Sequence, residues 1–243
     1  MLTKIRIVLV ETSHPGNIGS VARAMKTMGL RDLCLVKPHF FPHPDATALA
    51  AGADDLLMQA GVVSSLDEAI APCQLVLGLT ARPRSIEWPS LVPREAADMV
   101  AREAEIDRIA FVFGREQSGL SNDELARCHH AVTIPADPQY SSLNLAAAVQ
   151  IICYELFQHA PLAAPRVESV PGTRYVTADD MEGFFDHCAE AMQHVGFFDA
   201  GNPQIVMRRL RRLFSRTRLD ENEHNIWRGF FRAVVAQTAR KTV

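Results

Sequence analysis

Three short segments place polar or charged side chains directly after an apolar run, and the first two also contain glycine. The first is residues 15–19 with Arg23 beyond it, the second is residues 113–120, and the third is residues 134–135 followed by 141–144. In α/β proteins, ligands bind at the carboxyl ends of the strands. Backbone amides beside a glycine can hold an anion, and an arginine fork can bind a phosphate. These segments are therefore the candidate site.

The first segment carries Gly16, Asn17 and Gly19 at the expected start of an amphipathic helix. Such a glycine-bearing turn can bind an anion at the helix N-terminus. It is neither the G-x-G-x-x-G dinucleotide fingerprint nor a P-loop, which requires Gly-Lys-Ser/Thr. An ordinary β–α turn with Asn17 as the N-cap explains the same residues. Arg23, six residues after Asn17, either faces solvent or binds a phosphate.

The second segment places Arg115 and Glu116 between Gly114 and Gly119, after an apolar run. Two glycines around a charged pair indicate a tight loop whose backbone passes close to a ligand. A surface Arg–Glu pair on a turn would give the same pattern. Both interpretations remain open for this segment from the residues alone.

The third segment places Ser141, Ser142 and Asn144 at the start of a long apolar helix. Either serine could cap that helix by accepting a hydrogen bond from a backbone amide of its first turn. Backbone amides exposed at the same point could instead hold an adenine edge or a carboxylate. The residues alone leave both roles open.

The elements that must position these segments alternate between strand and helix over residues 5–160. Short apolar runs typical of strands buried on both faces lie at residues 5–10, 33–36, 75–79, 109–113 and 131–134. Helical patterns lie at residues 18–28, 67–70, 94–105, 122–126 and 143–159. Ser121 and Glu124 have the spacing of a capping box. This alternation predicts an α/β fold, with a mostly parallel sheet and helices on both faces.

The composition changes after residue 160. Residues 161–174 have the proline and alanine content of a linker, so we expect one domain over 1–160 and a small all-α extension over 175–243. Thr177 would cap the first helix of this extension, and further helices are expected at about 203–214 and 221–240. Residues 204–218 contain no acid and six arginines: Arg208, Arg209, Arg211, Arg212, Arg216 and Arg218. This stripe contacts phosphates, forms a solvated helix face or pairs with the more acidic first domain.

Bulk composition narrows the class of protein. The chain has 243 residues, is 48% apolar and has a formal net charge of −3, which gives no nucleic-acid signal for the whole molecule. Its five cysteines form no C-x-x-C pair, which favours free thiols in a reducing cytoplasm. The first apolar run is interrupted by Glu11 too early for a signal peptide or membrane span. Cys128-His129-His130 lacks a second ligand pair, so a core role is expected and no metal site.

Taken together, the three segments resemble the motifs of the SPOUT superfamily of knotted methyltransferases, in its 2′-O-ribose branch. Order, spacing and strand context agree over residues 4–158. Within that branch the chain resembles the bacterial enzymes that methylate tRNA at cytidine or uridine 32, whose helical extension matches residues 175–243. The resemblance implies a C-terminal trefoil knot that binds S-adenosylmethionine. It also implies a homodimer whose site is completed across the interface. Without it, an unknotted doubly wound sheet would be expected.

The resemblance also implies roles for the site residues. Arg23 would lie at the reacting 2′-hydroxyl, and because a guanidinium stays protonated we expect it to bind the adjacent phosphate and stabilise alkoxide charge rather than act as a base. The side chains expected to orient Arg23, the cofactor and the loops are Asn17, Glu116, Ser142 and Asn144. The cofactor would contact Leu79, Thr80, Ala81, Gly114, Ile134, Ser141, Ser142 and Leu143, and a side chain at position 114 would block it. The arginines expected to contact tRNA outside the reacting loop are Arg208, Arg209, Arg211 and Arg212.

The implied reaction is 2′-O-methylation of ribose 32 in the tRNA anticodon loop, without a metal. A related enzyme acting on ribosomal RNA or on another tRNA position is one alternative. A knot protein that binds RNA without turnover is another, although Arg23, Glu116 and Asn144 argue against it. A nicotinamide dehydrogenase is a more distant reading, since the glycine fingerprint is absent.

Overall fold

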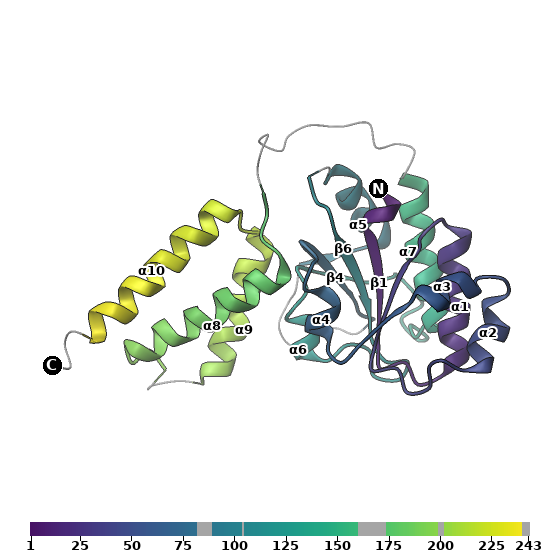
Figure 1. Cartoon of the computed structure of the whole chain (residues 1–243), viewed down its shortest axis with the longest axis horizontal. Helices are drawn as coiled ribbons and strands as arrows, with labels where there is room; N and C mark the ends of the chain where they lie inside the picture. Colours follow the sequence, from purple (N-terminus) through teal and green to yellow (C-terminus); the bar gives the residue numbers. More distant parts are fainter. Residues whose placement is uncertain (82–88, 104, 160–173, 199–201, 240–243) are drawn as a thin grey trace.

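The strands of the first 160 residues form one parallel sheet in the computed structural model, which describes residues 1–81, 89–103, 105–159, 174–198 and 202–239 (Figure 1). They are β1 (Ile5–Val10), β2 (Asp32–Val36), β3 (Gly61–Val63), β4 (Leu75–Leu79), β5 (Ser90–Leu91), β6 (Ile109–Phe113) and β7 (His130–Val132). Within the described residues their order is β3-β2-β1-β6-β4-β7-β5, and neighbouring strands pair in parallel. The predicted fold class is confirmed.

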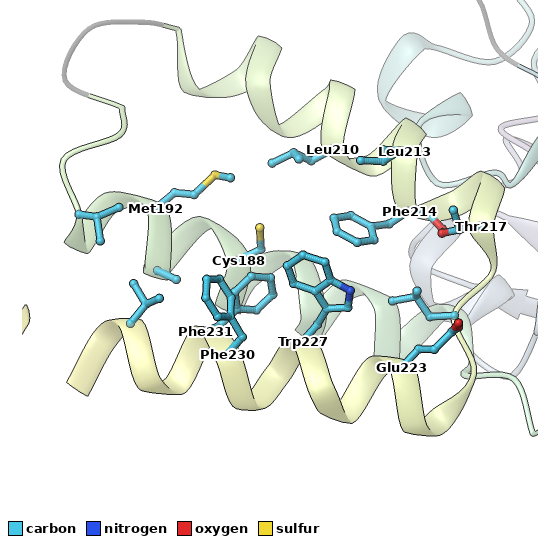
Figure 2. Close-up of a pocket in the computed structure, with 14 residues that line it drawn as sticks. Cys188, Met192, Leu210, Leu213, Phe214, Thr217, Glu223, Trp227, Phe230 and Phe231 are labelled. Carbon is cyan, nitrogen blue, oxygen red and sulfur yellow. The ribbon is translucent and has the colours of Figure 1, made fainter. Parts of the chain in front are cut away.

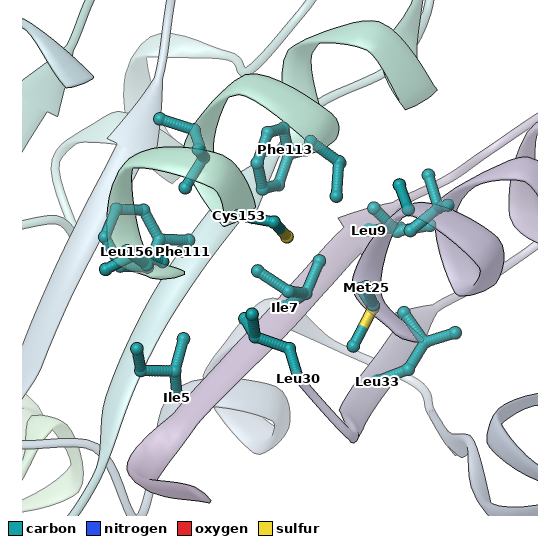
Figure 3. Packing of buried hydrophobic residues seen from close by; sticks show 14 of the residues in the cluster. Ile5, Ile7, Leu9, Met25, Leu30, Leu33, Phe111, Phe113, Cys153 and Leu156 are labelled. Atoms are coloured by element: carbon teal, nitrogen blue, oxygen red, sulfur yellow. The ribbon is translucent and has the colours of Figure 1, made fainter. Parts of the chain in front are cut away.

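Alternate residues of the central strands pack into two separate hydrophobic cores, because successive side chains of a strand point to opposite faces. Ile7 and Phe111 pack on one face with Met25 and Cys153 (Figure 3). Val8, Val10, Val76 and Val112 pack on the other face. All five positions of β6 are buried, as its continuous apolar run predicts.

Helices cover both faces of the sheet. On the first face lie α1 (Pro15–Thr27), α5 (Pro93–Arg102) and α7 (Leu145–His159), with α2 (Pro44–Ala50) and α3 (Asp54–Gln59) packed outside α1. On the second lie α4 (Leu66–Ile70) and α6 (Asn122–Leu125). A 3₁₀ turn, Leu2–Lys4, precedes β1. The sheet is therefore buried on both faces. A ligand site in such a fold lies at the ends of the strands.

Gly19 is required by helix packing. A Cβ at this position of α1 would lie 2.0 Å from the backbone oxygen of Ala46 in α2. Close contact between two helix backbones therefore accounts for this glycine. The pattern alone did not predict α2, so this contact could not be foreseen.

The helix starts were predicted with mixed success. The capping box of Ser121 and Glu124 is confirmed at the start of α6, and Thr177 caps the first helix of the extension as expected. Asn17 is not an N-cap, because α1 begins earlier, at Pro15, with His14 in the cap position. Proline suits the first helical position, where its missing N–H has no intrahelical role. Asn17 therefore lies inside the first turn with its amide free for other partners.

The C-terminal extension consists of α8 (Ala178–His194), α9 (Pro203–Thr217) and α10 (Glu221–Ala239), as the sequence predicted. Its core is aromatic, with the Phe184 ring centroid 4.8 Å from that of Phe214 and 5.3 Å from that of Phe231. Figure 1 shows α8 beside the sheet and α10 farther from it. The expected linker over 161–174 lies almost entirely outside the described residues.

The trefoil knot stays a prediction, since the segment between β4 and β5 includes residues 82–88, which lie outside the described ranges. What the described residues do show is a sheet order in which β6 lies between β1 and β4, and β7 between β4 and β5. Late strands are thus inserted between earlier ones. No described helix is long and apolar enough to cross a membrane.

Candidate active site

A cavity of about 190 Å³ lies at the carboxyl ends of β4, β6 and β7 and beside the start of α7. Apolar side chains and small polar groups share its wall, as is usual for small-molecule sites. All eight residues expected to contact a cofactor line it: Leu79, Thr80, Ala81, Gly114, Ile134, Ser141, Ser142 and Leu143. The second and third segments singled out in the sequence therefore meet at one place.

Glu116 joins the loop after β6 to the start of α1. Its carboxylate accepts hydrogen bonds from Ser13 N at 3.2 Å, Ser13 Oγ at 3.1 Å, His14 N at 3.3 Å and Asn17 Nδ2 at 3.0 Å. Burial opposes ionisation of Glu116, yet the bonds from Asn17 and the two backbone amides keep its pKa below the ordinary value. An anionic Glu116 is thus built into the structure as an acceptor.

Asn17 and Asn144 connect the first segment to the third. Asn144 Nδ2 donates to Asn17 Oδ1 at 3.2 Å, while Asn17 in turn donates to Glu116. Asn144 Oδ1 also accepts from Ala146 N at 2.9 Å, which is the capping bond at the start of α7. The expectation that Ser141 or Ser142 caps this helix is wrong, and both serines are left exposed at the cavity.

Gly114 is also required for a reason that does not depend on a ligand. A Cβ at this position would lie 2.1 Å from the backbone carbon of Gly119 and 2.2 Å from Leu120 N. The loop between them is closed by backbone hydrogen bonds in both directions between Arg115 and Gly119. A side chain at position 114 would therefore break the loop itself, whether or not a ligand is bound.

Arg23 does not line the cavity of its own chain. It is exposed on α1, six residues beyond Asn17, which places it on a different side of the helix and about 9 Å along its axis. Its guanidinium forms no ion pair within the described part of the chain. The structure thus brings together Asn17, Glu116 and Asn144 but leaves Arg23 outside.

The arginine stripe of α9 is divided among several roles. Arg208 pairs with Asp123 of α6 at 2.8 Å, which is the alternative of pairing with the first domain. Arg211 donates to Glu182 at 2.7 Å and lies 4.4 Å from the ring centre of Phe185, inside the extension. Arg212 is half-buried, and Arg209 is exposed. Among the four arginines expected to contact RNA, Arg209 is therefore the one most accessible.

A larger hollow of about 650 Å³ lies inside the C-terminal extension, between α8, α9 and α10 (Figure 2). Its wall consists of aliphatic and aromatic side chains such as Leu213, Trp227 and Phe231, with Glu223 at one end. It has no set of converging polar groups that could orient a reacting molecule. The smaller cavity at the strand ends is for this reason the candidate active site.

His129 is a core residue, as the sequence analysis expected. It is 8% exposed, and its Nδ1 accepts the backbone N–H of Val76 at 3.0 Å. Burial, together with the charge of Arg218, lowers its pKa to about 3. The side chain is therefore neutral at physiological pH.

Several site contacts were not foreseen from the sequence. Ser13 and His14 bind Glu116 through backbone amides, which no side-chain pattern reveals. Arg115 binds Glu124, and the nine-residue spacing between them spans a loop and a helix start rather than one regular element. The one sign of this contact in the sequence was the charge of Arg115 within the second segment.

Comparison with known proteins agrees with this geometry. Residues 4–154 match the SpoU rRNA Methylase family, and residues 179–243 match the C-terminal domain of the tRNA methyltransferase TrmJ. The tRNA (cytidine/uridine-2′-O-)-methyltransferase TrmJ of Yersinia enterocolitica is 51% identical over 241 residues, covering 98% of this chain and 93% of its own.

Solved structures show the same fold. TrmJ from Z. mobilis ZM4 has a TM-score of 0.82 at 31% identity, covering 94% of this chain and 98% of its own. The SpoU methyltransferase AviRb from Streptomyces viridochromogenes, solved with the cofactor AdoMet, has a TM-score of 0.51 at 23% identity, covering 65% and 60%, and shares the fold. The matches over both parts of the chain, and the identity over nearly its full length, make it a member of the SpoU methylase family and, within that family, of the TrmJ tRNA methyltransferases.

Proposed function

We propose that this chain transfers a methyl group from S-adenosylmethionine to the 2′-hydroxyl of a ribose in tRNA. The observation that carries the proposal is the cavity at the strand ends, where loops after β4, β6 and β7 meet the start of α7. The Yersinia enterocolitica relative is named as a tRNA 2′-O-methyltransferase, and this chain matches it over nearly its full length. Family membership and site geometry therefore support the same reaction.

The residues of the cavity fit a nucleoside cofactor. Leu79, Ile134 and Leu143 offer apolar surface for a base, while Thr80, Ser141 and Ser142 contribute hydroxyls and backbone groups for its polar atoms. When bound, S-adenosylmethionine supplies an electrophilic methyl group, so the protein's task is to align the ribose hydroxyl and bind the RNA. No group of three metal-ligating side chains occurs among the described residues.

In this proposal Arg23 reaches the cavity of a second copy of the chain. Because it lies outside the cavity of its own chain, we expect a homodimer in which each Arg23 serves the cavity of the other copy. The outer side of α7 exposes Tyr154 and Phe157, which offer apolar surface for such an interface. An Arg23→Ala chain and a chain with a substitution in the cavity should each lack methyl transfer, and mixing them should restore it. If mixing restores no activity, the shared site is contradicted.

Arg23 would bind the phosphate next to the reacting ribose and stabilise the charge that develops on its oxygen. Asn17, Glu116 and Asn144 act together in positioning the loops, through the hydrogen bonds described above. Ser142 lies exposed in the cavity wall, where it is placed to contact cofactor or ribose. These roles divide binding of RNA, orientation of loops and contact with the cofactor among separate residues.

The target we propose is position 32 of the anticodon loop, with cytidine or uridine accepted. Residues 1–160 would form the catalytic domain, residues 161–174 the linker and residues 175–243 an extension that contacts tRNA. Arg209 is the exposed member of the expected contact set of Arg208, Arg209, Arg211 and Arg212. A cytoplasmic setting follows from the substrate and agrees with five free cysteines.

The test is transfer of labelled methyl from S-adenosylmethionine to unmodified bulk tRNA and, separately, to ribosomal RNA. We expect label in tRNA that is lost with Arg23→Ala. Label in ribosomal RNA alone would support methyl transfer but show that the substrate is ribosomal RNA. Cofactor binding without transfer to either RNA would favour a protein that binds RNA without turnover.

A further inference from the structure

Arg115 binds two carboxylates that belong to different elements. Its Nε donates to Glu11 Oε2 at 2.8 Å, just beyond β1, while Nη1 and Nη2 donate to the two oxygens of Glu124 at 3.0 Å, in α6. The hydrogen bond from Arg115 lowers the pKa of Glu11. Burial raises the pKa of Glu124, but the hydrogen bonds and charge of Arg115, together with the hydrogen bonds from Ser121, keep it below the ordinary value. A two-pronged pair of this kind fixes the orientation of the guanidinium as well as its position.

The loop that carries Arg115 forms one wall of the candidate active site. Residues 114–119 all line the cavity, and within this loop Arg115 and Gly119 exchange backbone hydrogen bonds of 2.8 and 3.3 Å. Gly119 has a φ of 68°, in the left-handed region that favours glycine. The side chain of Arg115 attaches this turn to the end of β1 and to α6.

Arg115 and its neighbour Glu116 hold the same stretch of chain at two points. Arg115 binds Glu11, while Glu116 binds Ser13, His14 and Asn17 a few residues later. That stretch leads directly into α1, the helix that carries Arg23. Arg115 and Glu116 therefore fix the position of the cavity loop relative to α1.

Resting on the proposed function, we infer that Arg115 is a positioning residue for the cofactor loop. Held by Glu11 and Glu124, it keeps residues 114–119 in the shape that binds S-adenosylmethionine. A loop that is already ordered loses less conformational freedom on binding, so its ligand binds more tightly. Loss of the guanidinium fork leaves the apolar core intact and loosens the loop.

The chain offers a matched control for this inference. Arg127 binds Asp67 with the same kind of two-pronged pair, its side chain is also 28% exposed, and it lies outside the cavity wall. Arg115→Lys and Arg127→Lys both keep a positive charge while removing the planar fork. Glu124→Gln removes one charge partner but keeps a side-chain oxygen for the N–H of Ser121.

The experiment titrates S-adenosylmethionine into the full chain and each variant by calorimetry, with thermal unfolding and amide exchange of residues 114–119 measured in parallel. We expect Arg115→Lys to weaken cofactor binding about tenfold and to speed amide exchange in the loop. Glu124→Gln should act in the same direction, and Arg127→Lys should leave both readouts unchanged.

Unchanged cofactor affinity in Arg115→Lys would overturn the inference, as would an equal loss in Arg127→Lys, because the effect would then reflect stability in general. If the unaltered chain binds no S-adenosylmethionine, the proposed function fails together with the inference. If it binds the cofactor but Arg115→Lys binds equally well, the inference alone fails.

Discussion

At the scale of single residues, the site depends on side chains that bind one another rather than on one reactive group. Glu116 accepts four hydrogen bonds, and Asn17 links it to Asn144. The sequence was enough to select these residues, because each stands in a polar segment that follows an apolar run. It could not supply their partners, since two of the donors to Glu116 are backbone amides.

Replacing Glu116 by Gln tests this arrangement. The amide has one acceptor oxygen and presents an NH₂ group toward donors, so some of the four bonds are lost. We expect methyl transfer to fall at least about tenfold and stability to fall by about 1–3 kcal/mol. Glu68→Gln is the control, because Glu68 also accepts a backbone amide and a hydroxyl, from Ser64, away from the cavity. Equal activity of the two variants would contradict the role of Glu116.

His129 gives a pH-dependent stability that can be measured separately from activity. The unfolded chain protonates this histidine near pH 6.5, whereas the folded chain does so near pH 3. Stability should therefore fall as the pH falls below 6.5, by up to about 1.4 kcal/mol for each pH unit.

The variant His129→Asn keeps an acceptor for Val76 N and removes this titration. Urea unfolding at pH 7 and pH 5 should show a smaller loss of stability in the variant than in the unaltered chain. Since His130 and His187 are present in both, the difference isolates His129. Equal losses in the two proteins would contradict the assigned cause.

At the scale of elements, strong patterns were predictive and several short elements were missed. The buried strands and the long helix α7 follow from apolar runs and periodicity. By contrast, α2, α3, β3 and β5 were missed, because each has at most seven residues and a weak pattern. The missed α2 also hid the reason for Gly19, which depends on a contact between distant parts of the chain.

Gly19→Ala tests the packing of α1 on α2. The added Cβ would clash with the backbone of Ala46, so we expect a loss of about 1–3 kcal/mol in the free energy of unfolding. Gly229→Ala in α10 is the control, because no atom lies within 4 Å of its added Cβ and alanine favours the helix. Denaturant unfolding of both variants measures the contrast. A Gly19→Ala chain as stable as the control would refute the packing argument.

At the scale of the whole molecule, several polar contacts hold the extension against the first 160 residues. Ala178 N donates to Cys73 O at 3.0 Å, Arg208 pairs with Asp123, and Arg218 pairs with Glu103. The sequence predicted a row of arginines on α9, but it could not show which of them form ion pairs and which face solvent. That division depends on which residues of the first 160 lie against α9.

The stripe can be dissected by single substitutions. Arg209→Ala should weaken tRNA binding and reduce the slope of its salt dependence by about one, with stability unchanged. Arg211→Ala should instead lower stability, because it leaves the partly buried Glu182 without its partner. Filter binding at several salt concentrations, together with thermal unfolding, separates the two effects. Weaker tRNA binding without a change of salt slope in Arg209→Ala would exclude a phosphate contact.

The central claim is methylation of a ribose oxygen in tRNA, and alkaline hydrolysis of the product tests it most directly. A 2′-O-methyl group blocks cleavage of the bond that follows it. We expect tRNA treated with the protein and S-adenosylmethionine to show one protected bond, after nucleotide 32, and none with Arg23→Ala. A labelled tRNA whose every bond is still cleaved would place the methyl group on a base and contradict the account.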